Sequence, residues 1–581
     1  MSAPTVTANT GIARKLGGFA TLHEGLDYAA RGVTGFNFYS PRGKLETTLT
    51  YRELRERARA TARRLMGLGL VRGARVAVIA ETSPSFMDVF FGCQYAGFVP
   101  VPMPYSMYIG GRHAYIQRLE GMITNSGASL IVAPQALADQ VREAVKQADC
   151  GRFITHEDLL EAGMWRGELA PFSPGETAYI QYSSGSTSDP KGVLVTQKAI
   201  MANADVSLQH GLKPGDDDRG FSWLPLYHDM GLVGFCIGPM LGQLTIDYLA
   251  TPAFARRPLL WLKIMSENRC TVAYSPSFGY DLAVRRLKNE ISELDLSCWR
   301  VAGIGGDMVR PDILREFSET FGPAGFSSRA FNPSYGMAES TLAVTFSPLD
   351  EEIVIDRVDR NQAKLFGRAV PARETDQDGV ATTREFVACG KPLPGHDLGV
   401  FNAEGRRLND REIGHILIKG PSVMQGYFRN HEATAAVMKD DGWMDTGDMG
   451  YMLDGQIVIT GRSKDLILHN GRNIWPQDIE WAAEEVAPLR KGDAAAFSID
   501  KDNDEKVVVL VQCRMTDEEK QLSLRREIGA IVQRHAGVDC DVVLVPPRSL
   551  PFTSSGKLSR VGAREGFLSG DIVAISSHAQ G

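Results

Sequence analysis

The stretch RVAVIAETSPSFMDVFFGCQYAGFVPVPM (residues 75–103) decides the fold class. It begins with the short apolar run RVAVIA (75–80), continues into a segment that can form a helix from near Pro84, and ends on the apolar run FVPVPM. Short apolar runs are typical of buried strands, and proline is favoured in the first turn of a helix. The order strand, helix, strand predicts a β-α-β unit.

The segments on either side repeat this alternation. Residues 50–68 begin with Thr50 and Glu53 at the spacing of a helix capping box, and they predict an amphipathic helix. Its apolar face is formed by Leu54, Ala58, Leu65 and Leu68. Further short apolar strands are predicted at residues 129–134, 177–182, 271–275 and 300–305. Alternation of this kind indicates an α/β protein with mostly parallel sheets covered by helices.

The pattern changes after about residue 380. Short strands separated by Gly, Asp and Asn turns are typical of an antiparallel ribbon, and they continue to about residue 470. From about residue 463 onward, two helical stretches alternate with the apolar strands KVVVLVQC (506–513) and DVVLVP (541–546). This last part predicts a small α+β domain of its own. We therefore predict two domains, residues 1–462 and residues 463–581.

Composition places the chain among ordinary globular proteins. It has 581 residues, of which 43% are hydrophobic and 23% charged, and a net charge of -7, so nothing favours nucleic acid as a partner. At about 150 residues per domain, the length predicts roughly four units, some of them fused subdomains. Eight cysteines occur without a C-x-x-C pair, which argues against a structural zinc site or a disulfide framework.

The location follows from the N-terminus and from hydropathy. The first residues lack the apolar core of a signal peptide, and no apolar run approaches the length of a membrane span. We therefore expect a cytoplasmic protein without a transmembrane segment.

The stretch YSSGSTSDPKGV (182–193) is rich in small hydroxyl and glycine residues and contains Lys191. Such residues allow backbone N–H groups and hydroxyls to surround an anion, and the lysine adds a positive charge, so the stretch favours phosphate binding. Its spacing differs from that of the common nucleotide loop, because Pro190 precedes the lysine and Gly192 follows it. A flexible surface loop is the alternative interpretation.

Two further stretches carry side chains suited to a nucleotide. NPSYGMAEST (332–341) offers Tyr335, which could stack on a purine, and Glu339, which could hold Mg²⁺. An ordinary strand-to-helix junction is the alternative there. GWMDTGDMG (442–450) places Asp445 and Asp448 among glycines in what should be a tight turn. A carboxylate there could accept both hydroxyls of a ribose, and an Asp-Gly hairpin turn is the alternative.

Two more stretches lie nearer the C-terminus. GRSKDLILHNGRNIWPQDIE (461–480) contains Arg462, Lys464 and Asp465, and we expect a loop where the two domains meet. Charged residues in such a place could also do no more than solvate a linker. PFTSSGKLSR (551–560) sets Lys557 on a Ser/Gly-rich loop, where an exposed lysine is the alternative interpretation.

Taken in order, these five stretches resemble the adenylate-forming superfamily of acyl-CoA synthetases, peptide-synthetase adenylation domains and luciferases. The resemblance runs from about residue 50 to about residue 560. It implies a multidomain α/β fold, with a large N-terminal domain of two helix-covered sheets and a distorted β-barrel. It also implies a small, mobile α+β C-terminal domain that carries the catalytic lysine, and an enzyme that uses ATP and Mg²⁺.

The resemblance assigns roles to individual residues. The outer phosphates of ATP and the departing pyrophosphate would be held by Ser183, Ser184, Gly185, Ser186, Thr187 and Lys191. The nucleotide site would further include Gly305, Gly306, Asp307, Ser334, Tyr335, Gly336, Met337 and Ala338. In it, Tyr335 would stack on adenine, while Asp448 and Arg462 would reach the ribose. Glu339 and Thr187 would position Mg²⁺, and Lys557 would be the catalytic lysine.

Two details favour the fatty-acyl-AMP ligases within this superfamily. LPLYHDMGL (224–232) and KDLILHNGRNIWPQDIE (464–480) are similar to the versions found in that branch. The segment 344–389 is long, charged and turn-rich at the place where that branch carries an insertion, which is implicated in preventing CoA from completing the reaction. A variable surface loop is the alternative interpretation of the segment.

The resemblance then implies ATP-dependent conversion of a medium- or long-chain fatty acid to its acyl-adenylate, with release of pyrophosphate. The acyl group would pass to the phosphopantetheine thiol of an acyl carrier protein in polyketide or peptide lipid biosynthesis. A long-chain acyl-CoA synthetase is the rival enzyme. A non-catalytic adenylate-binding scaffold is a remote alternative, because Lys557, Glu339 and the phosphate loop are all present.

The acyl pocket is the least specific part of the prediction. His228 would lie at the carboxylate end of the pocket and take part in catalysis, or it is a structural histidine at a helix start. Apolar residues of MGLVGFCIGPML (230–241) could line the tunnel for the alkyl chain, although core packing produces the same string.

Overall fold

The computed structural model describes residues 11–105, 111–183, 191–287, 290–372, 383–469, 472–501, 504–553 and 557–575. The predicted β-α-β unit is present. Strand β3 (Arg75–Ile79) leads into helix α3 (Pro84–Ala96), and strand β4 (Val99–Met103) returns parallel to β3. Ser83 caps the start of α3, and Gly97, at a φ of 70°, ends it. The unit belongs to a four-stranded parallel sheet of order β4-β3-β5-β6, completed by β5 (Leu130–Ala133) and β6 (Arg152–Thr155).

Helix α2 (Tyr51–Gly67) confirms the predicted capping box. The Thr50 hydroxyl accepts a hydrogen bond from Glu53 N at 3.1 Å, and the Glu53 carboxylate accepts one from Thr50 N at 2.9 Å. The helix packs on α3 at Gly92, where a Cβ atom would lie 3.0 Å from the Thr61 side chain. The absence of a side chain at Gly92 therefore lets the two helices approach closely.

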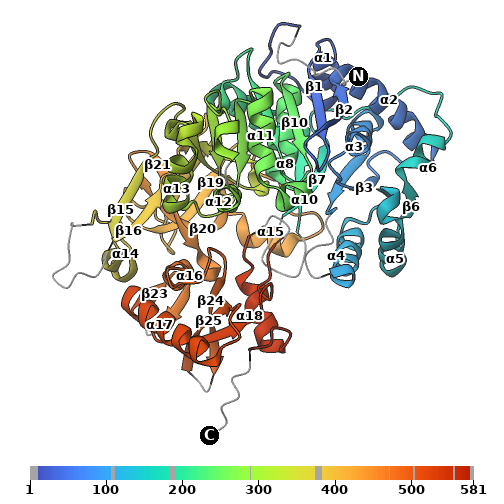
Figure 1. The fold of residues 1–581 in the computed structure, drawn as a ribbon. Helices are drawn as coiled ribbons and strands as arrows, with labels where there is room; N and C mark the ends of the chain where they lie inside the picture. The colour runs from blue at the N-terminus through green and yellow to red at the C-terminus, as the bar shows by residue number, and fades with distance from the viewer. Residues whose placement is uncertain are drawn as a thin grey trace.

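A nine-stranded sheet forms the centre of the molecule, in the order β17-β14-β13-β12-β11-β9-β10-β1-β2 (Figure 1). Its strands are β1 (Gly35–Tyr39), β2 (Leu45–Thr50), β9 (Arg219–Ser222), β10 (Thr245–Leu249), β11 (Val272–Ser275), β12 (Val301–Ile304), β13 (Phe331–Gly336), β14 (Ala343–Phe346) and β17 (Lys391–Pro392). The middle strands run parallel, whereas β2, β14 and β17 pair antiparallel. Helices such as α12 (Ser277–Arg286) and α13 (Pro311–Phe321) cover the sheet. The predicted α/β class is confirmed.

One predicted strand pairs differently from the others. Strand β7 (Thr177–Tyr182) forms at the expected residues, but it pairs antiparallel with β8 (Gly192–Thr196) in a two-stranded hairpin. The connection between these two strands is too short for a parallel return, which requires a crossover of about a dozen residues or more.

A second, antiparallel sheet follows, as predicted. Its order is β18-β19-β20-β21, and its strands are β18 (Asp397–Phe401), β19 (Gly414–Lys419), β20 (Met444–Leu453) and β21 (Gln456–Arg462). Among the described residues this sheet stays open, because β18 and β21 do not pair with each other. Four strands are too few to close into a barrel, so the expected barrel is an open sheet.

The tight turn predicted at residues 442–450 is wrong. Asp445 and Asp448 instead lie within strand β20. Gly447 adopts a φ of 74°, and the register with β21 shifts between Met449 and Gly450. The glycines therefore bend a strand locally, and they do not reverse the chain.

The C-terminal elements gather below the two sheets, in orange and red in Figure 1. They are β22 (Ile467–His469), β23 (Arg472–Ile474), α16 (Pro476–Glu484), β24 (Ala494–Lys501), β25 (Asp504–Gln512), α17 (Glu518–Ala536), β26 (Cys540–Val545) and α18 (Arg560–Ser569). Strands β24, β25 and β26 form one sheet, with α17 and α16 against it. The loop expected at 461–480 thus contains the β22-β23 hairpin and the start of α16.

The charged segment between β14 and β17 also contains regular structure. It includes strand β15 (Ile355–Asp359), helix α14 (Arg360–Phe366) and strand β16 (Thr383–Val387). Strands β15 and β16 pair antiparallel over five positions, and α14 lies beside the C-terminal elements in Figure 1. The segment therefore has elements of its own that can make specific contacts.

The eight cysteines are all free thiols. Across the described part of the chain, no helix has both the length and the apolar composition that crossing a bilayer would require.

Candidate active site

A cavity of about 940 Å³ opens at the carboxyl ends of the central strands. The loops after β11, β12 and β13 meet there because parallel strands bring their C-terminal ends to one edge of the sheet. Strand β20 and the C-terminal elements close the cavity from the other side. The predicted site residues that line it are Ser183, Lys191, His228, Gly305, Gly306, Asp307, Ser334, Tyr335, Gly336, Met337, Ala338, Glu339, Asp448, Arg462 and Lys557.

The hydroxyl-rich loop reaches this cavity through its two ends. Ser184, Gly185, Ser186 and Thr187 lie outside the described residues. Ser183 N donates a hydrogen bond to Lys191 O at 3.1 Å, which extends the β7-β8 hairpin. The Lys191 ammonium lies 5.2 Å from the centre of the Tyr427 ring, within cation–π range. The hairpin thus holds both ends of the loop at the cavity wall.

The turn after β12 is shaped by two glycines. Gly306 has a φ of 80°, and a Cβ atom on Gly305 would lie 2.6 Å from Ser334 O. The turn directs the Asp307 carboxylate back to Ser277, whose N and Oγ both donate to it at 3.1 Å. Burial raises the pKa of Asp307 to about 6, although the hydrogen bonds from Ser277 and the positive charge of Lys557 oppose the rise.

Tyr335 and Arg462 hold Asp448 from two sides. The Tyr335 hydroxyl donates to Asp448 Oδ2 at 2.8 Å, and Arg462 Nε lies 3.3 Å from Asp448 Oδ1. Asp448 and Tyr335 are each only 8% exposed. The pKa of Arg462 is raised mainly by Asp448. This contact joins strand β13 to strands β20 and β21, so one side chain from the central sheet orients a carboxylate of the antiparallel sheet.

Glu339 lies on the 3₁₀ turn that follows β13. Its Oε1 accepts a hydrogen bond from the Tyr427 hydroxyl at 2.8 Å. Burial raises the pKa of Glu339; the Tyr427 bond opposes the rise, and the nearby Asp229 adds to it. Thr341, two residues on, has a φ of 72°, a conformation that costs a non-glycine residue about 1–3 kcal/mol. Its hydroxyl donates to Ser422 O at 2.8 Å, which helps to hold the turn.

The surroundings of Glu339 suit a hard divalent cation. Mg²⁺ prefers carboxylate oxygens and usually takes only one or two of them from the protein, with substrate phosphates and water completing the set. Glu339 and Asp229 offer such oxygens in one corner of the cavity. In the residues that the structure describes, no group of three or more His, Cys, Asp or Glu is placed to hold a metal. A cation here would therefore need the nucleotide as a further ligand.

Lys557 enters the cavity from the C-terminal elements. Its backbone is held by Thr553, whose hydroxyl accepts from Lys557 N at 3.2 Å. Burial lowers the pKa of the lysine and Arg462 lowers it further, whereas Asp229, Asp307 and Asp448 act in the opposite direction. The side chain is half-buried in a cavity with acidic neighbours, so it does not match the alternative of an exposed lysine.

Arg560 fixes the segment that carries Lys557. Its guanidinium pairs with Asp465 at 2.7 Å and with Glu480 at 2.7 Å, and both carboxylates are buried. Asp465 thus helps to hold the segment that carries Lys557, while Lys464 lines the cavity. The charged stretch at 461–480 does more than solvate a linker.

His228 stands at a helix start and also lines the cavity. It precedes helix α8 (Asp229–Leu232), and its Nδ1 lies 2.5 Å from Asp229 Oδ1. Asp229 also accepts a hydrogen bond from Met230 N at 2.8 Å. Burial raises the pKa of Asp229, but His228 and Lys557 outweigh it and the pKa is lowered overall. Both interpretations of His228 are therefore compatible with its position.

Three residues of the site escaped the sequence analysis. Asp229 stands beside His228 and could have been noticed as a second carboxylate, whereas Ser277 and Tyr427 carry no signal in the sequence. Their partners Asp307 and Glu339 are 30 and 88 residues away along the chain. Only the fold brings these pairs together.

Comparison with known proteins shows the family to which the chain belongs. The family described as AMP-binding enzymes matches residues 37–428. A Caulobacter vibrioides protein, provisionally named an acyl-CoA synthetase, is 46% identical over 555 residues, which cover 95% of this chain and 96% of the relative. The medium-chain-fatty-acid–[acyl-carrier-protein] ligase JamA of Moorena producens is 31% identical over 580 residues, covering 95% and 96%.

A solved structure gives the same result at the level of the fold. It comes from a study of fatty acyl-adenylate ligases from E. coli and L. pneumophila, and it is 42% identical to this chain. The two superpose with a TM-score of 0.92, covering 96% of this chain and 100% of the other. The chain is therefore a member of the AMP-binding enzyme family, an adenylate-forming ligase related to the fatty-acyl-AMP ligases.

Proposed function

We propose that this ligase joins a medium- or long-chain fatty acid to AMP and then passes the acyl group to the thiol of an acyl carrier protein. The observation that carries the proposal is the meeting of Lys557 with Tyr335, Glu339 and Asp448 in one cavity. The same cavity extends along the apolar residues Val233 and Leu208. It offers a place for a nucleotide and a place for an alkyl chain that share one reaction centre.

The nucleotide would bind between the central sheet and strand β20. The Asp448 carboxylate is oriented by Tyr335 and Arg462, which supports its role as the acceptor for ribose hydroxyls. The Tyr335 ring and the turn Gly305–Asp307 would enclose the adenine. Lys191 and the hydroxyl-rich loop would hold the outer phosphates. These groups fix the α-phosphorus of ATP in reach of an incoming carboxylate.

The reaction forms a bond between a carboxylate oxygen and the α-phosphorus and breaks the bond from that phosphorus to the bridging oxygen, so that pyrophosphate leaves. Nucleophile and phosphates are all negative, and the developing charge must be neutralised in place. Lys557 would do this on the side of the new bond, and Lys191 on the side of the leaving group. Glu339 would hold Mg²⁺, which supplies further charge neutralisation when bound.

The charged segment 344–389 supports a carrier protein over CoA as acceptor. It contacts the C-terminal elements at several points. Arg360 donates to His535 O at 2.7 Å, Lys364 to Ala536 O, and Arg384 pairs with Asp478 at 3.0 Å. Arg384 and Asp478 are almost fully buried at this contact. The segment would therefore hold the C-terminal elements in the orientation that places Lys557 in the cavity, and would oppose the rearrangement that CoA transfer requires.

The named relatives point to both acceptors. JamA is named as a ligase of acyl carrier protein, whereas the Caulobacter relative is named for CoA. The contacts of the segment with the C-terminal elements decide our preference for the carrier protein.

An acceptor assay tests the proposal. The protein is incubated with a fatty acid, ATP and Mg²⁺, and with either CoA or a phosphopantetheinylated carrier protein, and acyl transfer and pyrophosphate release are followed separately. With fatty acid, ATP and Mg²⁺ we expect pyrophosphate release even when no acyl acceptor is present. When the carrier protein is added, we expect the acyl group to be transferred to it. Rapid acyl-CoA formation would identify the protein as an acyl-CoA synthetase, and absence of pyrophosphate release with every fatty acid would reject adenylate formation.

We further propose a division at residue 462, with residues 463–581 as the mobile domain, and a cytoplasmic location. The change from antiparallel sheet to separate C-terminal elements supports the first. Free thiols, which persist in reducing compartments, support the second.

A further inference from the structure

Two helical walls line the apolar arm of the cavity beyond His228. One wall is helix α7 (Gln197–Val206) with the π-helical turn η2 (Ser207–Leu212). The other is α8, continued by the π-helical turn η3 (Val233–Ile237) and helix α9 (Gly238–Leu241). Most side chains on these walls that face the cavity are apolar. π-Helical turns are frequent at functional sites.

Gly234 is an unusual residue in the second wall. Its neighbours Val233 and Phe235 are buried, but Gly234 is partly exposed, and it lines the cavity. Its backbone is not among those with positive φ, so the conformation does not require glycine. A glycine in a helix costs about 1 kcal/mol relative to alanine. Glycine at this position therefore requires a reason other than backbone conformation.

Packing against the described residues does not explain the glycine. Among the residues that the structure describes, a Cβ atom on Gly234 would meet only Leu342 Cδ2, at 3.5 Å, which is an ordinary contact. The other glycines of this wall differ. A Cβ on Gly231 would lie 2.2 Å from Pro225 O, and one on Gly238 would lie 3.0 Å from Val233 O. Backbone atoms of the described chain therefore exclude a side chain at Gly231 and disfavour one at Gly238. At Gly234 no described atom does so, and the absence of a side chain there leaves space in the cavity.

The distance of Gly234 from the reaction centre follows from its place in the helical wall. Met230, four residues earlier, lies at the nucleotide end of the wall, because its Cε would be 3.6 Å from a Cβ on Gly306. A helical rise of about 1.5 Å per residue places Gly234 about 6 Å farther along the arm. An alkyl chain attached to an adenylate beside Met230 would therefore pass Gly234 after its first few carbons.

We propose that Gly234 is a specificity-determining residue that leaves the arm open to long, unbranched alkyl chains. The inference rests on the proposed function and deepens it by naming the residue that selects between fatty acids of different chain length. A side chain at this position would narrow the arm between the wall and Leu342. Acids that end before Gly234 would bind as before, and longer ones would be excluded.

The test compares chain-length profiles of Gly234→Ala, Gly234→Leu and the wild type. The kcat/KM for pyrophosphate release is measured with straight-chain acids from about C4 to C18, a range in which each buried CH₂ adds about 0.8 kcal/mol. Gly121→Leu is the matched control. Gly121 lies in helix α4 (Gly111–Ser126), outside the cavity, and no described residue has an atom within 4 Å of its Cβ position.

For Gly234→Leu we expect a loss of about 100-fold or more with the longest acids and a change of less than about threefold with the shortest, because several CH₂ groups would lose their burial. Gly234→Ala should show a smaller loss in the same direction, and Gly121→Leu the wild-type profile. Retained activity on short acids shows that the variants fold.

The inference would be overturned by an unchanged profile in both Gly234 variants, or by an equal loss at every chain length in Gly234→Ala. A wild type that releases no pyrophosphate with any fatty acid would instead reject the proposed function. A wild type that prefers the shortest acids would reject only the inference about Gly234.

Discussion

At the scale of single residues, the Asp448 carboxylate shows how the site is prepared for its ligand. Its two oxygens are oriented by Tyr335 at 2.8 Å and Arg462 at 3.3 Å, and little of the side chain is exposed. A hydrogen bond to a charged group contributes about 1.5–3 kcal/mol, so these contacts reduce the freedom that binding would otherwise have to remove. Residues that touch no reacting atom can thus influence nucleotide binding.

Replacement of Tyr335 by phenylalanine tests this role. The ring remains, but Asp448 loses its hydroxyl partner, and we expect the KM for ATP to rise about tenfold, corresponding to about 1.4 kcal/mol, with a smaller change in kcat. The measurement is pyrophosphate release as a function of ATP concentration. Tyr28→Phe is the control, because the Tyr28 hydroxyl donates to Ala13 O, outside the cavity. An unchanged KM for ATP in Tyr335→Phe would show that the hydroxyl does not orient the binding carboxylate.

At the scale of elements, the sequence predicts an element correctly where the interacting residues are close together in the chain. The capping box of α2 involves residues three positions apart, and the helix begins where it was predicted. The pairing of β7 and the place of Asp448 within β20 depend on neighbouring strands, so the sequence alone did not reveal them. Side chains that meet across the cavity, such as Tyr335 and Asp448, are 113 residues apart. Their contact follows from the assembled sheets alone.

The charged segment around α14 permits a test of the acceptor preference. Arg360→Ala with Lys364→Ala removes two hydrogen bonds to the C-terminal end of α17 without touching the cavity. We expect pyrophosphate release to stay within about twofold and acyl-CoA formation to rise by about tenfold, since each lost bond contributes about 1 kcal/mol. The readout is acyl-CoA formed in the presence of fatty acid, ATP and CoA.

Arg357→Ala is the matched control for this experiment. Arg357 lies in the same segment and is 62% exposed. Its ion pair in the described part of the chain is with Glu385, at 3.7 Å. It should leave the acceptor preference unchanged. If the double variant makes no more acyl-CoA than this control does, the segment does not restrain the C-terminal elements through α17.

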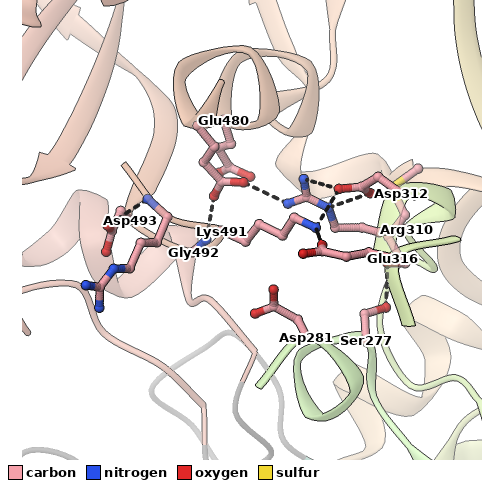
Figure 2. A network of polar contacts seen from close by, with 12 residues as sticks. Ser277, Asp281, Arg310, Asp312, Glu316, Glu480, Lys491, Gly492 and Asp493 are labelled. Carbon is pink, nitrogen blue, oxygen red and sulfur yellow. Dashed lines mark hydrogen bonds and ion pairs between the residues drawn. The ribbon is translucent and has the colours of Figure 1, made fainter. Parts of the chain in front are cut away.

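At the scale of the whole molecule, an ionic network joins the central sheet to the C-terminal elements. Figure 2 shows Lys491 reaching from the C-terminal elements to Asp312 and Glu316 on α13, each at 3.0 Å. Arg310, at the start of α13, pairs with Glu484 of α16 at 2.7 Å. These contacts support the orientation in which Lys557 lies in the cavity. The Arg310–Glu484 pair is largely buried, whereas Asp312 and Glu316 are about half-exposed. A buried pair adds little net stability, because desolvation offsets the attraction, but breaking it by removing one partner is costly.

Glu484 makes the network sensitive to pH. Burial raises its pKa from the ordinary value of 4.5 to about 7, although Arg310 and the Gly492 amide oppose the rise and Glu480 adds to it. Because the folded state holds this proton more tightly than the unfolded state, the stabilisation is complete below about pH 4.5 and is lost as the pH rises through 7.

Relative to Glu484→Gln, the wild type should therefore lose roughly 1–3 kcal/mol of unfolding free energy between about pH 5 and pH 8. The measurement is the difference in thermal midpoint between the two proteins across this range. Glu319→Gln, on the exposed face of α13, is the control and is compared with the wild type over the same pH range. A constant difference for Glu484→Gln would mean that the carboxyl titrates outside this window.

We propose that Lys557, which enters the cavity from the C-terminal elements, stabilises the charge that develops when the acyl-adenylate forms. Its most direct test is pyrophosphate release by Lys557→Ala with a fatty acid, ATP and Mg²⁺, together with ATP binding by calorimetry. We expect a loss of at least about 100-fold in release while ATP still binds, because one charge-stabilising group is removed from a site that is otherwise intact. Near-normal pyrophosphate release by Lys557→Ala would contradict it.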